Sequence, residues 1–84
     1  MSVRDDIIEV FTSVAHDHAK RLVPLTDDVL LRESGIDSIC LAIVLTNLEA
    51  RLGSDPFNTL KEIEIPATFG EFVAVYERAV DAAS

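Results

Sequence analysis

The chain has 84 residues, and its 15 Asp and Glu residues against seven Lys and Arg residues give a formal net charge of −8 at pH 7. A chain of this length forms a single domain with one modest core, which leaves little room for a deep catalytic cavity. The negative charge disfavours nucleic acids and membrane surfaces as partners, whereas a protein with a basic surface would be attracted. The one cysteine, Cys40, excludes an internal disulfide and a thiolate metal cluster.

The beginning of the sequence lacks the apolar segment of a secretory signal peptide, because charges occur at once at Arg4, Asp5 and Asp6. No apolar run approaches the roughly 20 residues that a membrane-spanning helix needs. We therefore expect residues 1–84 to form one cytoplasmic domain.

A first helix is predicted from about Val3 to Leu22. Ser2 can serve as its N-cap, and Pro24 should end it. One face is marked by residues that recur at spacings of three and four: Val3, Ile7, Phe11, Val14, His18 and Leu22. Residues 23–37 then form a long connection, and a connection of this length in a compact domain usually has a function. Its apolar residues should pack against the domain: Leu25, Val29, Leu30, Leu31 and Ile36.

A second helix is predicted to begin at Asp37 or Ser38 and to end at Gly53, a natural helix C-cap. Its core stripe should consist of four leucines at helical spacing: Leu41, Leu45, Leu48 and Leu52. Residues 60–65 form at most one short helical segment.

The final helix should begin with a capping box, in which Thr68 and Glu71 satisfy each other's backbone N–H groups. Its apolar stripe consists of Phe69, Phe72, Val73, Tyr76 and Val80. The sequence therefore predicts an all-α fold, a small antiparallel bundle of three longer helices plus one short helix, with a long loop between helices one and two. Residues in the middle of the three stripes should be buried: Phe11, Leu45, Leu48, Phe72 and Tyr76.

The segment that carries chemistry is Gly35-Ile36-Asp37-Ser38-Ile39, at the junction of the long loop and the second helix. Taken alone, it is a capped helix start, with Asp37 or Ser38 as the N-cap and a turn at Gly35. A serine at a helix start also faces solvent, and the helix end stabilises a phosphodiester through its free N–H groups and its dipole. A carrier domain needs such a hydroxyl, which another enzyme can reach, and it needs no active site of its own.

Together with the preceding Leu30-Leu31-Arg32-Glu33-Ser34 and the apolar helix that closes at Leu52-Gly53, this segment resembles the acyl and peptidyl carrier protein family. Ser38 matches the modified serine of the family's Asp-Ser-Leu signature, with Ile39 in place of leucine. The resemblance covers nearly the whole chain and implies a 4'-phosphopantetheine arm on Ser38, which a phosphopantetheinyl transferase attaches from coenzyme A. The arm would carry acyl or aminoacyl groups as thioesters. The implied partners are a loading ligase or synthetase and enzymes that use the cargo, while the carrier is a monomer and not an enzyme.

The second helix departs from the pattern of fatty-acid carriers, which typically place several acidic residues along it. Between Ser38 and Gly53 only Glu49 and Arg51 are charged, and Cys40 and Ile43 stand where carboxylates would be expected. This difference moves the expected cargo toward amino acids or specialised acids. The sequence does not identify the cargo or the loading enzyme. It also leaves open whether the domain is free-standing or cut from a larger synthase.

The partner-binding face is expected beside Ser38 and comprises Asp37, Ile39 and Ile43. The two isoleucines each lie about 200° around the helix from Leu41, on the side away from the predicted core stripe. A bundle this small rarely buries a helix on both sides, so these residues form a candidate docking patch. Alternatively, the long loop folds back over them.

Two other functions compete with a carrier. One is a helical adaptor that binds a protein partner through Ile39 and Ile43 without modification. The other is a small hydrolase or redox enzyme that uses Cys40 or a histidine, although the role of a small, semi-buried apolar residue is commoner for such a cysteine. His16 and His18 are two residues apart and cannot jointly hold a metal, and His18 should be half-buried. The Asp27-Asp28 pair lacks the alternating ligands of a calcium loop, so no metal site is expected.

Overall fold

The computed structural model of the chain describes residues 2–53, 56 and 66–83, and within these ranges the secondary structure is helical. The described residues form three α-helices of 15 residues each: α1 (Val3–Asp17), α2 (Ser38–Leu52) and α3 (Phe69–Ala83). A short 3-10 helix, η1 (Leu31–Glu33), lies in the connection between α1 and α2. The predicted all-α fold with three longer helices is therefore confirmed, whereas the fourth short helix expected over residues 60–65 lies outside the described residues.

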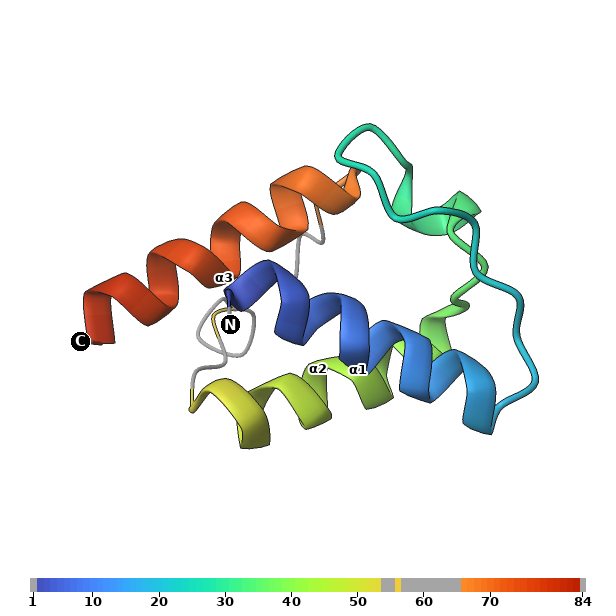
Figure 1. The fold of residues 1–84 in the computed structure, drawn as a ribbon, viewed down its shortest axis with the longest axis horizontal. Helices are drawn as coiled ribbons and strands as arrows, with labels where there is room; N and C mark the ends of the chain where they lie inside the picture. The colour runs from blue at the N-terminus through green and yellow to red at the C-terminus, as the bar shows by residue number, and fades with distance from the viewer. Residues whose placement is uncertain (1, 54–55, 57–65, 84) are drawn as a thin grey trace.

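Helix α1 packs against both other helices. In Figure 1 it runs from left to right, and α2 and α3 return from right to left on either side of it, as expected for an antiparallel bundle. No helix in the described ranges has both the length and the apolar character needed to cross a membrane.

Helix α1 begins as predicted and ends earlier than predicted. The Ser2 hydroxyl accepts the N–H of Asp5 at 3.1 Å and caps the helix start. The helix ends at Asp17, because Ala19 adopts a left-handed conformation with φ 54° and the N–H of Lys20 donates to the carbonyl of Ala15 at 2.7 Å. These features form a Schellman motif with alanine in the position that glycine usually occupies. The prediction that Pro24 ends this helix was therefore wrong.

The predicted inward face of α1 is correct only up to the end of the helix. Ile7, Phe11 and Val14 are buried and Val3 is half-buried, while Val10, which was not part of the predicted stripe, is buried as well. His18, which was expected to be half-buried, is exposed because it lies beyond the last turn. Leu22 is half-buried and packs against the core from the loop rather than from the helix.

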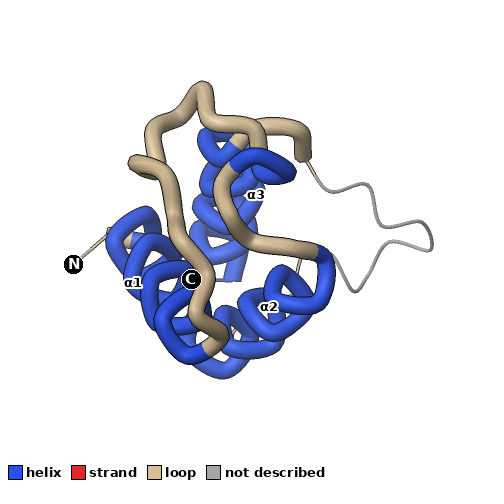
Figure 2. The backbone as a smooth tube through the Cα atoms, turned by 90° about the vertical axis from the view of Figure 1, so that its right-hand side faces the viewer, coloured by secondary structure: helices blue, strands red, loops and turns tan. Residues whose placement is uncertain are grey.

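The long connection packs against the domain, as its apolar residues predict. Leu31 and Ile36 are buried, while Leu25 and Val29 are half-buried and contact the core. Figure 2 shows the connection passing along one end of the bundle, from the end of α1 to the start of α2. It is therefore a structured part of the fold.

Backbone hydrogen bonds attach this connection to the start of α3. The N–H of Phe69 donates to the carbonyl of Val29 at 2.8 Å, and the N–H of Gly70 donates to that of Asp27 at 3.0 Å. The N–H groups in the first turn of a helix have no partner within the helix, so the loop carbonyls satisfy two of them. An ion pair of 2.6 Å between Arg4 and Asp27 holds the same loop to the start of α1.

Helix α2 has the predicted ends and a different buried face. Gly53 adopts a left-handed φ of 71° and caps the C-terminus. The buried residues are Cys40, Val44 and Leu48, whereas the other three leucines of the predicted stripe are only half-buried: Leu41, Leu45 and Leu52. The helix is apolar around most of its circumference, so the leucine pattern did not fix its rotation about its axis.

Helix α3 has its predicted buried face, and of the two hydrogen bonds of the predicted capping box the structure shows the one that Thr68 accepts. The N–H of Glu71 donates to the Thr68 hydroxyl at 3.2 Å. Phe69, Phe72, Val73 and Tyr76 are fully buried, as the stripe predicts.

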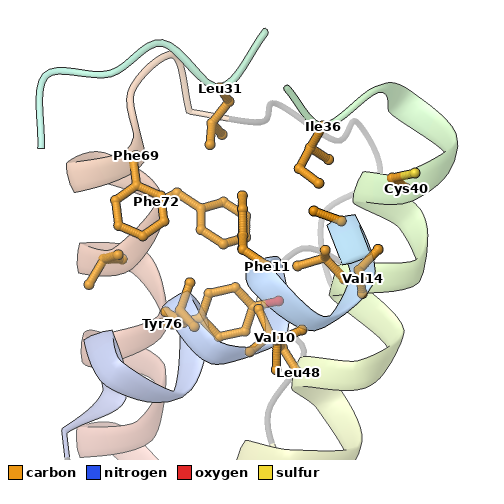
Figure 3. Packing of buried hydrophobic residues seen from close by; sticks show 14 residues of the cluster. Val10, Phe11, Val14, Leu31, Ile36, Cys40, Leu48, Phe69, Phe72 and Tyr76 are labelled. Atoms are coloured by element: carbon orange, nitrogen blue, oxygen red, sulfur yellow. The ribbon is translucent and has the colours of Figure 1, made fainter. Parts of the chain in front are cut away.

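The core is built around aromatic rings that α1 and α3 contribute. The ring of Phe11 lies edge-on to those of Phe69 and Phe72, with centroid distances of 5.4 and 5.6 Å. The rings of Phe72 and Tyr76 are 5.2 Å apart. Figure 3 shows this cluster below Leu31 and Ile36, which point into the interior from the loop. Of the residues predicted to be buried, Phe11, Leu48, Phe72 and Tyr76 are fully buried and Leu45 is half-buried.

Candidate functional site at the start of helix α2

Asp37, not Ser38, is the N-cap of α2. Its side-chain Oδ1 atom accepts the N–H of Cys40 at 2.8 Å, and its backbone carbonyl accepts the N–H of Leu41 at 2.9 Å. Ser38 is the first helical residue and is exposed. Among the described residues, no hydrogen bond engages the Ser38 hydroxyl. The cap and the exposed hydroxyl are therefore supplied by two different residues, so Ser38 is not needed to start the helix.

A tight turn directly before Asp37 is fixed by a buried serine and a glycine. The hydroxyl of Ser34 donates to the carbonyl of Leu31 at 2.6 Å. Gly35 has φ 105°, and a Cβ atom at this position would lie 1.9 Å from the carbonyl oxygen of Arg21. The predicted turn at Gly35 is confirmed, and the structure adds a second reason for the glycine, which is the close passage of another loop segment.

That passing segment also brings Lys20 to the site. The Nζ atom of Lys20 lies 3.1 Å from Oδ2 of Asp37. The hydrogen bond from the Cys40 backbone, together with Lys20, lowers the pKa of Asp37 from 3.8 to about 2, and Asp37 in turn raises the pKa of Lys20. Because its pKa is so low, the Asp37 carboxylate is too weak a base to activate the neighbouring hydroxyl. Nothing in the local sequence pattern of Lys20 indicated this contact.

The surroundings of Cys40 oppose a reactive thiolate. The Cys40 side chain is 2% exposed, and burial and the nearby Asp37 carboxylate raise the pKa of its thiol. A thiolate is the reactive form of cysteine, so this environment opposes a nucleophilic role. His16 and His18 are both exposed. No cluster of three or more possible metal ligands occurs within residues 2–53, 56 and 66–83.

The structure separates the two isoleucines of the predicted docking patch. Ile39 follows Ser38 directly and is 72% exposed, so the described part of the loop does not cover it. Ile43 is half-buried and packs against the core. Of the predicted partner-binding residues, Asp37 and Ile39 are therefore exposed beside Ser38, whereas Ile43 is only partly exposed.

A cavity of about 400 Å³ lies beside Ser38, although the chain length predicted little room for one. Its walls come from α1, the long loop, the start of α2 and the segment before α3: Phe11, Leu30, Leu31, Arg32, Ser34, Ile36, Asp37, Ser38, Leu41, Pro66 and Ala67. Most of these side chains are apolar, and the volume falls in the usual range of sites for small molecules. The sequence did not indicate this cavity, because three stretches that are distant in the chain have to meet to form it: Phe11, residues 30–41 and residues 66–67.

Comparisons of the chain with protein-family models, with curated proteins and with solved structures find no match. The site itself combines an exposed hydroxyl on the first turn of a helix, an exposed isoleucine and an apolar cavity. Asp37, the carboxylate next to the hydroxyl, is ion-paired and weakly basic. The arrangement therefore leaves the Ser38 hydroxyl accessible, with no strong base supplied by the neighbouring Asp37.

Proposed function

We propose that the chain is a carrier domain that bears a 4'-phosphopantetheine arm on Ser38 and holds acyl or aminoacyl groups on it as thioesters. The observation that carries this proposal is the exposed Ser38 hydroxyl, which stands at the start of α2 while Asp37 does the capping. The resemblance of the segment around Ser38 to the carrier protein family supports it. So does the order of the elements, in which a helix and a long structured connection precede the serine.

The start of α2 fits a phosphodiester. Asp37 engages the N–H groups of Cys40 and Leu41, which leaves those of Ser38 and Ile39 in the unpaired first turn of the helix. Such N–H groups and the helix dipole stabilise a negative charge at this end. When attached, the arm supplies a thiol that forms thioesters with carboxylic acids.

Attachment is a transfer reaction with coenzyme A as the donor. The Oγ atom of Ser38 forms a bond to the phosphorus atom nearest the pantetheine group, and the bond from that phosphorus to the bridging diphosphate oxygen breaks. Adenosine 3',5'-bisphosphate leaves, and a base of the transferase takes the hydroxyl proton. Ser38 therefore needs access and orientation rather than activation by its own neighbours.

The proposed cargo is an amino acid or a specialised acid. Helix α2 carries no charge between Ser38 and Leu48, unlike the acidic helix of typical fatty-acid carriers. The apolar cavity beside Ser38 offers space for part of the arm or for a small acyl group. The proposed partners are a phosphopantetheinyl transferase, a loading ligase or synthetase, and enzymes that use the loaded group, and the carrier itself acts as a monomer.

Intact mass after incubation with coenzyme A and a broad-specificity phosphopantetheinyl transferase tests the proposal. The wild type should gain the mass of one phosphopantetheine group, and Ser38→Ala should gain none. Since Ser38 does not cap α2, its replacement should change the free energy of unfolding by no more than about 0.5 kcal/mol. Ser13→Ala, which changes an exposed serine of α1, should be modified normally. Modification of folded Ser38→Ala would contradict the assignment of the site.

The second candidate function is an unmodified helical adaptor, which the exposure of Ile39 favours. An adaptor would gain no mass in the same experiment. It would instead bind a protein partner through Ile39 whether or not Ser38 is present.

A further inference from the structure

The Asp37 carboxylate uses its two oxygens for two different partners. Oδ1 accepts the N–H of Cys40 and so caps α2, while Oδ2 lies 3.1 Å from the Nζ atom of Lys20. Asp37 directly precedes Ser38 in the chain. The ion pair therefore places a cation from the segment after α1 at the start of α2, next to the residue that is proposed to be modified.

The backbone holds Lys20 in place through a conformation that is unfavourable for the residue before it. Ala19 adopts φ 54°, which disfavours any residue with a Cβ atom. The N–H groups of Ala19 and Lys20 donate to the carbonyls of His16 and Ala15, at 3.2 and 2.7 Å. Non-glycine residues in such conformations persist where their surroundings hold them, and they are frequent at functional sites.

An uncompensated carboxylate before Ser38 would oppose the proposed modification. The reaction places a phosphodiester anion on the Ser38 oxygen, and two negative charges at short distance repel each other. The ammonium group of Lys20 cancels the charge of Asp37. Since the two side chains are 38% and 47% exposed, solvent weakens these interactions and the effect on a rate should be a few-fold.

We propose that Lys20 is a positioning residue for the modification of Ser38. It holds the Asp37 carboxylate in its capping geometry and compensates its charge, so that the phosphodiester forms beside a neutral ion pair rather than beside a free anion. This inference rests on the proposed carrier function, and it assigns a role to a residue that is remote from Ser38 in the sequence.

A double-mutant cycle on Lys20 and Asp37 tests the inference. The rate of mass gain is measured with coenzyme A and a broad-specificity phosphopantetheinyl transferase for the wild type, K20M, D37N and the double variant. Asparagine caps helices about as well as aspartate, so D37N removes the charge and keeps the start of α2. We expect K20M to slow modification about three- to tenfold when Asp37 is present and to have little effect in the D37N background.

Two further variants separate charge compensation from a general effect on the fold. R21M removes the same charge from the next residue, and among the described residues Arg21 takes part in no ion pair. It should be modified at the wild-type rate. K20R keeps the cation and should also retain that rate. Salt at about 1 M should reduce the difference between the wild type and K20M, because the Debye length falls to about 3 Å.

The outcomes distinguish this inference from the proposed function. If K20M slows modification equally in the Asp37 and D37N backgrounds, or no more than R21M does, Lys20 does not act through Asp37 and the inference is wrong while the carrier function stands. If the wild type gains no mass at all, the proposed function is wrong and this inference is wrong with it. A loss of rate that requires Asp37 and is rescued by K20R supports the inference.

Discussion

Replacing Gly35 with alanine should destabilise the domain by about 2–4 kcal/mol, because the new methyl group meets the backbone of another segment in a conformation that disfavours any side chain. An ideal Cβ atom at Gly35 would lie 1.9 Å from the carbonyl oxygen of Arg21, with the backbone at φ 105°. That oxygen belongs to the backbone, so one of the two crossing segments has to move. A domain of this length has a total stability of roughly 4–13 kcal/mol at about 0.05–0.15 kcal/mol per residue, so the loss would be a large share of it.

The free energy of unfolding can be measured by urea denaturation followed by circular dichroism. Gly53→Ala is the matched control, because Gly53 also has a positive φ of 71° but nothing lies within 4 Å of a Cβ atom there. It should cost only about 1 kcal/mol, which is the penalty for a left-handed alanine. Since the Gly35 turn directly precedes Asp37 and Ser38, G35A should also slow the modification of Ser38, and G53A should not. Equal losses of stability in the two variants would refute the reasoning, because the crossing of the two segments would then tolerate a methyl group.

Four further changes test other parts of the molecule. Phe72→Ala should lower the free energy of unfolding by about 3–5 kcal/mol in urea denaturation, because its ring is fully buried against two others. A loss below about 1 kcal/mol would mean that α3 packs elsewhere. Ala19→Gly should raise the free energy of unfolding by about 1 kcal/mol in the same assay, because glycine adopts φ 54° without a Cβ penalty. An unchanged free energy would mean that the backbone at Ala19 is not strained. Folding lowers the pKa of Asp37 from 3.8 to about 2. The free energy of unfolding of the wild type should therefore fall relative to that of Asp37→Asn as the pH falls from about 4 to 2. Parallel profiles of unfolding free energy against pH would contradict this. Ile39→Glu should reduce the rate of loading by the cognate ligase more than Glu49→Gln does, because Ile39 is exposed beside Ser38. The loading rate of the wild type should depend only weakly on salt. A steep salt dependence together with normal loading of Ile39→Glu would contradict apolar docking.

The features that were predictable from sequence are those with a local signal. Helix α2 begins after Asp37 and ends at Gly53, because a capping side chain and a left-handed glycine mark the two ends. The start of α3 follows from Thr68, whose hydroxyl accepts the N–H of Glu71. These signals depend on residues within one turn of each other, and tertiary contacts do not have to be known to read them.

The end of α1 had no such signal. Ala19 occupies the left-handed position where glycine would have marked the stop, and Leu22 continues the helical spacing although it lies in the loop. Pro24 then suggested a later end. The apolar spacing correctly identified Leu22 as a residue that packs against the core, but it could not say from which kind of backbone.

Tertiary contacts account for the rest of what was missed. The rotation of α2, which buries Cys40 and Val44 rather than Leu41 and Leu45, is chosen by packing because both sides of the helix are apolar. The exposed Ser38 was predicted from its place at a helix start. The surroundings of Ser38 were not predicted, since Lys20 and part of the cavity wall come from segments that are distant from it in the chain.

The hydrogen bonds between the long loop and α3 change what an insertion or deletion in that loop would do. Surface loops usually tolerate changes of length, because few contacts depend on their exact path. Here the carbonyls of Asp27 and Val29 accept the first N–H groups of α3, which begins some forty positions later in the chain. A shift of one residue in the loop would therefore present different carbonyls to Phe69 and Gly70. A change in the length of the loop would therefore have to break or re-form the hydrogen bonds at the start of the third helix. The long loop is thus hydrogen-bonded at fixed positions to α3, the helix that supplies most of the aromatic core.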